Sequence, residues 1–136
     1  MPACLIALTP AARRALGGDR CEIARYPFRV GRECRRPGGS GSRDRPERRS
    51  PDAQGINDVY LDDAGRNGID VSREHFQIEH GSEGHTLVDR SSACGTIVEG
   101  RLVGGDRTGG RAALRDHDVI VVGSQESPFV FKFRAG

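Results

Sequence analysis

Short runs of alternating apolar and polar residues, separated by glycine-rich turns, constrain the fold of this 136-residue chain most strongly. The last run, Phe129 to Phe133, places three phenylalanines on one face of an extended strand, and that face must be buried. Runs of this kind recur about every ten residues, and none has the length and period of a lasting helix. The pattern predicts an all-β sandwich of roughly ten short strands, in which function is left to the loops.

The segment from Arg35 to Ile56 does not follow this pattern. It contains four glycines, three prolines and six arginines, and Ile56 is its only large apolar residue. Such a segment cannot bury enough surface to offset the entropy lost on ordering. We expect residues 35–56 to form a flexible insertion loop within a single domain that spans residues 1–136. A solvated insertion without a role and an accessory anion-binding arm both fit this composition.

Composition and charge exclude several classes of protein. A net charge of +2 argues against a chain devoted to nucleic acid. The four cysteines are scattered, without a Cys-x-x-Cys pair or zinc-site spacing, so we expect free thiols and no metal or cofactor. The amino terminus has no signal-peptide pattern, and no apolar run approaches the roughly 18 residues of a membrane span. These features predict a cytoplasmic protein.

Polar motifs stand at the ends of several predicted strands. Gly31-Arg32 follows one strand, and Ser72-Arg73-Glu74-His75 leads into another. Ser92-Ala93-Cys94-Gly95-Thr96 precedes a third strand, and Asp118-Val119-Ile120-Val121-Val122-Gly123 lies near the end of the chain. A serine hydroxyl beside a guanidinium is a ready pair of donors for an anion. The motifs therefore predict an anion site on loops at one end of the sandwich.

The order and spacing of these motifs resemble the forkhead-associated (FHA) domain family, from about Leu5 to Phe133. That family is marked by a Gly-Arg, a Ser-x-x-His and an Asn-Gly-Thr loop, followed by a late Gly-Asp-x-Ile-x-x-Gly element. The resemblance implies an FHA-like β-sandwich of about eleven short strands in two sheets. It also implies that the apical loops bind phosphothreonine in a partner protein, either a kinase substrate or a kinase itself.

The resemblance assigns roles to five residues of the first two motifs. Arg32 and Ser72 match the two central phosphate ligands of the family, and Arg73 matches a position that often adds a phosphate contact. Gly31 and His75 match structural positions, where the glycine shapes the turn and the histidine braces the loops. The planar donor fork of Arg32 suits a phosphate, which carries about −1.5 to −2 charges at pH 7.

The third motif departs from the family pattern. Ala93, Cys94, Gly95 and Thr96 match the loop that faces the bound peptide, but the usual Asn before Gly-Thr is replaced by Cys94. Cysteine is a weak donor and a poor acceptor, and each neutral hydrogen bond lost costs about 0.5–1.5 kcal/mol. Two hypotheses follow. The chain is either a phosphothreonine-dependent interaction module or an FHA-fold scaffold that binds partners without phosphate.

Two other classes of function fit less well. The Arg35–Arg49 segment has no aromatic residue on which a base could stack, which argues against specific nucleic-acid binding. An enzyme is not expected, because His75 is the only motif residue that could serve Cys94 as a base. Asp70, which precedes the serine motif, is predicted to favour a basic residue downstream of the phosphate.

Overall fold

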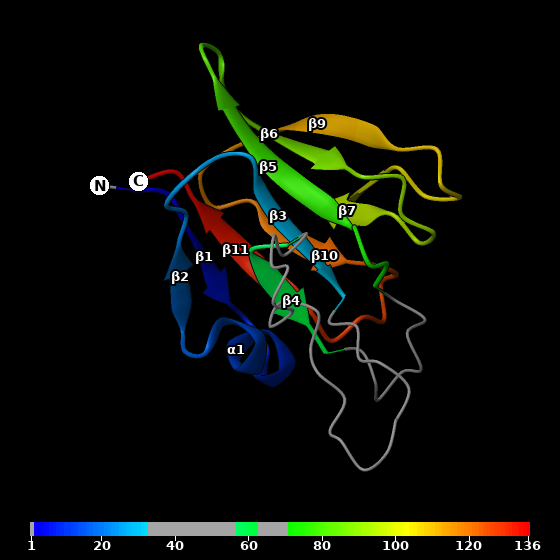
Figure 1. The fold of residues 1–136 in the computed structure, drawn as a ribbon, viewed down its shortest axis with the longest axis horizontal. Coiled ribbons are helices and arrows are strands. Elements are labelled where there is room, and N and C mark those ends of the chain that lie inside the picture. Colours follow the sequence, from blue (N-terminus) through cyan, green and yellow to red (C-terminus); the bar gives the residue numbers. More distant parts are fainter. Residues whose placement is uncertain (1, 33–56, 63–70) are drawn as a thin grey trace, which may run out of the picture.

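The computed structural model describes residues 2–32, 57–62 and 71–136, and within them the chain forms one short helix and eleven strands (Figure 1). The elements are, in order, β1 (Cys4–Ala7), α1 (Pro10–Leu16), β2 (Arg20–Glu22), β3 (Phe28–Arg32), β4 (Val59–Leu61), β5 (Phe76–Gly81), β6 (Gly84–Asp89), β7 (Thr96–Val98), β8 (Arg101–Val103), β9 (Gly110–Leu114), β10 (Val119–Val122) and β11 (Val130–Arg134).

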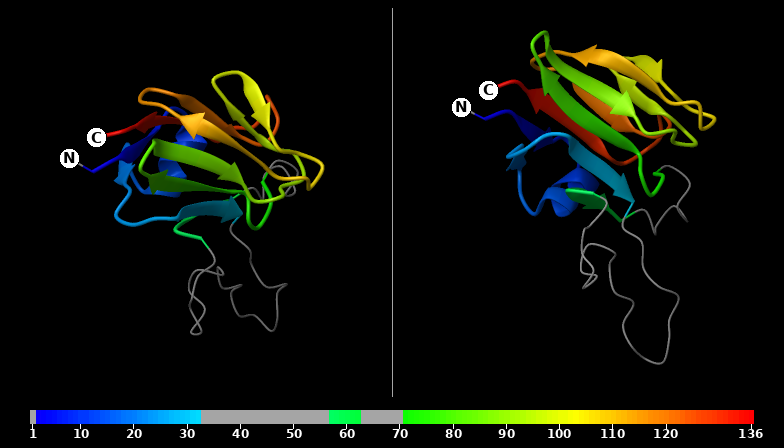
Figure 2. Two further views of the ribbon diagram at one scale, coloured as in Figure 1. Left: turned by 90° about the horizontal axis from the view of Figure 1, so that it is seen from above. Right: turned by 45° about the horizontal axis from the view of Figure 1, so that its top comes forward.

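The strands form two sheets. The six-stranded sheet has the order β2-β1-β11-β10-β7-β8, and the five-stranded sheet has the order β4-β3-β5-β6-β9. Neighbouring strands pair antiparallel except β3 and β4, which run parallel. Strand β1 pairs with β11, so the two chain ends lie next to each other in every view (Figures 1 and 2). The predicted β-sandwich of about eleven short strands in two sheets is confirmed.

Phenylalanines fill the space between the sheets. Phe131 and Phe133 of β11 are fully buried, as is Phe76 at the start of β5, and Phe129 is 3% exposed. The alternation from Phe129 to Phe133 therefore predicted the core face of the last strand correctly. Removing a buried phenyl ring costs about 3–5 kcal/mol because the cavity is only partly refilled.

The helix α1 is more regular than the sequence indicated. We expected no lasting helix, because Gly17-Gly18 follows at once, yet residues 10–16 are helical. The side chain of Thr9 accepts a hydrogen bond from the Ala12 amide at 3.2 Å, and Gly17 ends the helix in the left-handed conformation at φ 74°. These caps satisfy the groups that a short helix leaves open at its ends, and the burial of Ala12 in the core holds it in place.

None of the helices in the described parts of the chain could cross a membrane. The predicted insertion at residues 35–56 lies outside the described residues, as does Asp70.

Candidate functional site

Two of the sequence motifs meet where β3 ends and β5 begins. The amide of Arg32 donates to the carbonyl oxygen of Ser72 at 2.9 Å, and the amide of His75 donates to the carbonyl oxygen of Val30 at 3.1 Å. The Arg32 guanidinium also donates to the carbonyl oxygen of Val71 at 3.4 Å. These contacts continue the pairing of β3 with β5 beyond the strands. Arg32 and the serine motif therefore lie side by side, although they are far apart in the sequence.

The hydroxyl of Ser72 connects this pair to the third motif. Its oxygen accepts a hydrogen bond from the amide of Ala93 at 3.1 Å. A hydroxyl has one donor and two acceptor lone pairs, so the same group can still donate its proton to an anion. Ser72 is half-buried, Arg73 is exposed and Arg32 is half-buried. The structure thus brings all three residues that were predicted to bind phosphate to one end of the sandwich.

His75 connects the second and third motifs from the interior of the domain. It is fully buried, and its Nδ1 accepts a hydrogen bond from the Ser72 amide at 3.0 Å. Its Nε2 lies 2.7 Å from the carbonyl oxygen of Gly95. Because Nδ1 is an acceptor, a neutral ring carries its proton on Nε2 and donates it to Gly95. His75 is therefore a brace between two loops, and it does not face a ligand.

Gly31 allows the serine motif to close onto β3. A Cβ atom at this position would lie 2.0 Å from the carbonyl oxygen of Arg73 and 2.7 Å from Nδ2 of Asn57. Both distances are far below van der Waals contact, and the first involves backbone that cannot move without displacing the loop. Only glycine fits here while Arg73 keeps its position.

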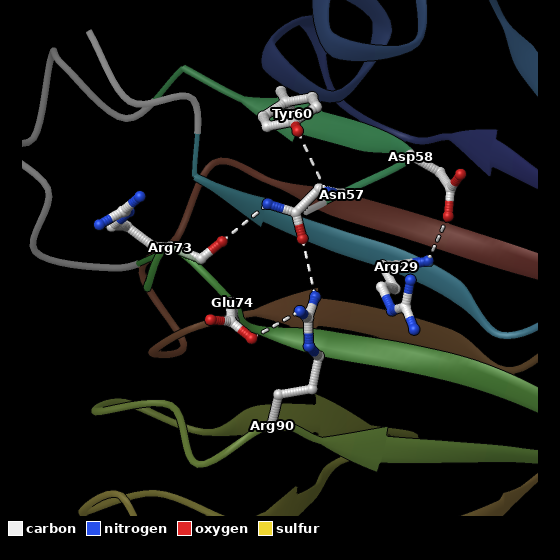
Figure 3. A network of polar contacts seen from close by, with 7 residues as sticks. All are labelled: Arg29, Asn57, Asp58, Tyr60, Arg73, Glu74 and Arg90. Atoms are coloured by element: carbon white, nitrogen blue, oxygen red, sulfur yellow. Dashed lines mark hydrogen bonds and ion pairs between the residues drawn. The ribbon is translucent and has the colours of Figure 1, made fainter. Parts of the chain in front are cut away.

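Asn57 clamps the same loop, and the sequence analysis did not identify it as a site residue. Its side chain is 7% exposed, and its Nδ2 donates to the carbonyl oxygen of Arg73 at 2.8 Å. Its Oδ1 accepts from the Arg90 guanidinium at 2.7 Å, and its amide donates to the Tyr60 hydroxyl at 3.1 Å. Figure 3 shows Asn57 pointing between these two arginines. Its position just before β4 indicated only a strand start, so no sequence signal identified the clamp.

Arg90 completes the clamp from the end of β6. Its guanidinium forms an ion pair with Glu74 at 2.8 Å as well as the bond to Asn57 (Figure 3). Burial lowers the pKa of Arg90, and the negative charge of Glu74 opposes that shift. An arginine remains charged throughout the physiological range, so Arg90 and Glu74 form a lasting ion pair that anchors the loop carrying Ser72 and Arg73.

Asp89 organises the third motif from inside. Its carboxylate is 3% exposed and accepts three hydrogen bonds, from the Ser92 amide at 3.0 Å, the Ser92 hydroxyl at 2.6 Å and the Thr96 hydroxyl at 3.0 Å. The Ser92 hydroxyl oxygen accepts from the Gly95 amide at 2.9 Å. Gly95 and Thr96 were expected to face a peptide, but both are buried. The reason is that Thr96 satisfies Asp89, so the two residues support the loop.

Ala93 and Cys94 form the outer part of this loop. Ala93 is exposed and Cys94 is half-exposed. The loop that follows β8 packs beside them, since the Asp106 amide donates to the Ala93 carbonyl oxygen at 2.8 Å and the Arg107 amide donates to that of Ser92 at 2.9 Å. With the Ala93 amide bonded to the serine hydroxyl, these backbone groups already have partners within the domain.

The chemistry of the site favours an oxyanion. Arg32 at the end of β3, Arg73 beside Ser72 and Arg107 in the loop after β8 are exposed or half-exposed cations, and the backbones of Arg32 and Arg107 bond to those of Ser72 and Ser92. Guanidinium groups offer planar forks of donors that match phosphate or carboxylate oxygens. No group of three or more metal-ligating side chains occurs among the residues that the structure describes.

Comparison with known proteins gives a family and a fold. The FHA domain family model matches residues 29–123. The FHA domain of the CT664 protein from Chlamydia trachomatis has a TM-score of 0.60 at 19% identity, covering 98% of this chain and 97% of that one. Mycobacterium tuberculosis EmbR scores 0.58 at 19% identity, covering 98% of this chain but 24% of its own. The kinase-interacting FHA domain of KAPP from Arabidopsis has a TM-score of 0.57 at 22% identity, and the match covers 97% of this chain and 91% of that one. No curated protein matches the chain in sequence.

Proposed function

The chain belongs to the FHA domain family, and we propose that it is a phosphothreonine-dependent protein–protein interaction module in signalling. The observation that supports this most directly is the junction of Arg32 with Ser72, formed by the 2.9 Å bond between their backbones. It places a guanidinium and a hydroxyl at the same loop cluster, with Arg73 as the next residue. We assign the phosphate to Arg32, Ser72 and Arg73.

The strength of these contacts is sufficient to distinguish a phosphorylated partner from an unmodified one. A phosphate monoester presents three acceptor oxygens and about −1.5 to −2 charges at pH 7. Each charge-assisted hydrogen bond contributes roughly 1.5–3 kcal/mol net, so two or three of them change affinity by orders of magnitude. The neighbours agree with this chemistry, since EmbR is described in complex with a low-affinity phosphopeptide and an engineered FHA with a pTBD peptide.

The grip on the rest of the peptide is weaker than the family pattern would give. Ala93 and Cys94 offer no amide side chain, and the backbone around them is already hydrogen-bonded within the domain. One or two missing neutral bonds cost about 0.5–1.5 kcal/mol each. We therefore propose that the phosphate supplies most of the affinity. The partner is a phosphothreonine-containing protein, either a kinase substrate or the kinase.

The same departure favours the second candidate, an FHA-fold scaffold that contacts partners without phosphate. The two functions differ in their dependence on Arg32. If the domain depends on phosphothreonine, truncating Arg32 removes binding of the partner. If it is a scaffold that does not need phosphate, the truncation leaves partner binding unchanged.

A phosphothreonine peptide-library pull-down with the wild type and Arg32→Ala side by side tests the proposal. Arg29→Ala is the matched control, because Arg29 is exposed on the same strand and its backbone amide, not its side chain, bonds to Asp58 at 2.8 Å (Figure 3). We expect Arg32→Ala to weaken binding by at least about tenfold and Arg29→Ala to leave it unchanged. Equal binding of phosphorylated and unmodified peptide by the wild type would overturn the proposal.

Three further aspects of this function are proposals of the same kind. Residues 1–136 act as one domain with residues 35–56 as an insertion within it, the setting is cytoplasmic, and the domain carries out no catalysis of its own. The FHA family consists of interaction modules, which supports the last of these. Direct nucleic-acid binding would instead give a complex that weakens steeply with salt, and a gel shift at low salt detects it.

A further inference from the structure

The outer face of the six-stranded sheet carries a continuous apolar row. Val121 pairs directly with Ile97 on one side and with Val130 on the other, and Ile97 pairs with Leu102. The amide of Leu8 donates to the carbonyl oxygen of Val130, which extends the row to β1. Directly paired residues of antiparallel strands point to the same face, so these five aliphatic side chains form one row across the sheet.

This row lies on the face turned away from the core. The alternating neighbours Ile120 and Phe131 are fully buried between the sheets, and Val98 is 5% exposed. The two ends of the row are open to solvent, with Leu8 45% and Leu102 63% exposed. The next row on the same face consists of Ile6, Lys132 and Val119, which pair in register. Seven aliphatic side chains thus share this outer face with Lys132. Further charged residues lie toward the β2 edge, where Arg20 pairs with Ile6 and where Glu22 and Arg134 pair with Cys4.

The outer face of the five-stranded sheet has the opposite character. One of its rows is formed by Arg29, Gln77, Val88 and Arg111, and the next by Glu79, Thr86 and Ala113. These side chains interact with one another, as in the ion pair of Arg111 with Glu79 at 3.2 Å. An exposed sheet face is normally polar in this way, and an aliphatic face of this extent marks an interaction surface. The β-sandwich fold itself does not require the outer face of the six-stranded sheet to be apolar.

We propose that a second copy of this chain covers the apolar face, related by a two-fold axis that runs along β10. A face that pairs with itself must be complementary to its own reversed image. This axis passes through Val121 at the centre of the row and reverses it, so Leu8 lies over the partner subunit's Leu102. Val130 then lies over the partner subunit's Ile97, and aliphatic groups meet aliphatic groups along the whole row.

The charges on this face fit the same symmetry. Lys132, the only lysine in the sequence, stands on β11 and forms no ion pair within the described parts of the chain. Glu99 stands on the other side of β10, directly after β7, where its amide donates to the carbonyl oxygen of Val119 at 3.0 Å. One of its carboxylate oxygens accepts from the Val119 amide at 2.7 Å, so the other oxygen is the one that can meet a lysine. Each residue is one strand away from the axis. The rotation therefore brings Lys132 opposite the partner subunit's Glu99 and gives the dimer two cross-subunit ion pairs.

The extent of the face sets the expected affinity. Six strands about 4.8 Å apart and roughly 15 Å long present a face on the order of 30 by 15 Å. This is on the order of 450 Å², well below the roughly 800 Å² per partner that stable complexes bury, so the dimer should be weak and should form and dissociate with concentration. Because the axis runs along the strands, both copies carry their site loops at the same end.

Sedimentation equilibrium of the full chain between about 5 and 500 µM tests the proposal, a range that brackets a micromolar dissociation constant. We expect a monomer–dimer equilibrium in the wild type and a monomer in Val121→Lys, because two like charges would face each other at the axis. Val88→Lys is the matched control, since Val88 is a half-buried valine on the outer face of the other sheet. A wild-type monomer at every concentration, or equal dissociation by Val88→Lys, would show the proposal to be wrong.

A charge exchange keeps the test valid if Val121→Lys does not fold. Lys132→Glu and Glu99→Lys should each weaken the dimer at least about threefold, and the double variant should recover most of the loss, because the two singles place like charges together. A carbodiimide cross-linker should join Lys132 to the partner subunit's Glu99 in a species of dimer mass. Absence of both the recovery and the cross-link excludes this arrangement of the two copies.

Discussion

Asn57→Ala is the most informative single change, because the structure makes Asn57 the link between β4 and the loop that carries Arg73. The substitution removes the hydrogen bond to the Arg73 carbonyl oxygen at 2.8 Å and the bond from Arg90 at 2.7 Å. The backbone bond from Asn57 to Tyr60 does not depend on the side chain. The effect of the change is therefore confined to the clamp.

The size of the effect follows from these two bonds. A neutral hydrogen bond contributes about 0.5–1.5 kcal/mol, and one to a charged group contributes about 1.5–3 kcal/mol. The Arg90 side chain is 12% exposed, so solvent recovers part of the second contribution. We expect a net loss of about 2–3 kcal/mol in the free energy of unfolding. For a domain of this size that lowers Tm by roughly 6–15 °C.

The loop should also lose affinity for phosphate. Without the clamp, the Arg73 carbonyl oxygen loses its hydrogen bond from Asn57, so part of the binding energy is spent on ordering the loop. We expect the affinity for a phosphothreonine peptide selected from the library to fall roughly three- to tenfold. Thermal unfolding followed by circular dichroism and calorimetric titration with that peptide measure the two effects.

Asp58→Ala is the control for this pair of measurements. Asp58 follows Asn57 directly, accepts a hydrogen bond from the Arg29 amide at 2.8 Å and forms an ion pair with Arg25 at 3.3 Å. Within the described part of the chain it makes no hydrogen bond to the loop of the site (Figure 3). It should lower Tm and leave the affinity unchanged. If Asn57→Ala alters neither Tm nor affinity, or if Asp58→Ala weakens binding as much, the clamp does not position the site.

Two further predictions concern the buried carboxylate and the far end of the sandwich. Asp89→Ala removes three hydrogen bonds to Ser92 and Thr96 and should cost about 2–4 kcal/mol in a urea titration; an unchanged midpoint would contradict the role of Asp89. Burial, and then the neighbouring His80, lower the pKa of His85 from 6.5. The unfolded chain therefore binds more protons below about pH 6.5, and stability should fall with pH from there down to the folded pKa. Tm measured from about pH 7.5 to about pH 5.5 should fall less in His85→Gln, and identical profiles would refute this assignment.

Much of the architecture could be predicted because strand signals are local. Alternation places every second side chain on one face, so the phenylalanines of the last strand predicted their own burial. The motifs stood at strand ends, and the family resemblance connected them. The helix was missed because its stability depends on the cap at Thr9 and on the packing of Ala12, and neither contact is visible as a period in seven residues.

By itself, the sequence determined the fold class, the order of the loops and the chemical groups available for an oxyanion, since these follow from residue type and short-range pattern. Only the tertiary structure decided which polar groups face outward. Thr96 is turned inward by its bond to Asp89, and the role of Asn57 depends on its contact with Arg73, sixteen residues away in the sequence. The apolar outer face of the six-stranded sheet could not be predicted from the sequence either, because it too depends on contacts between distant residues. Each of its strands contributes only one or two aliphatic residues, and the register between strands, which no single stretch of sequence contains, joins them into one surface.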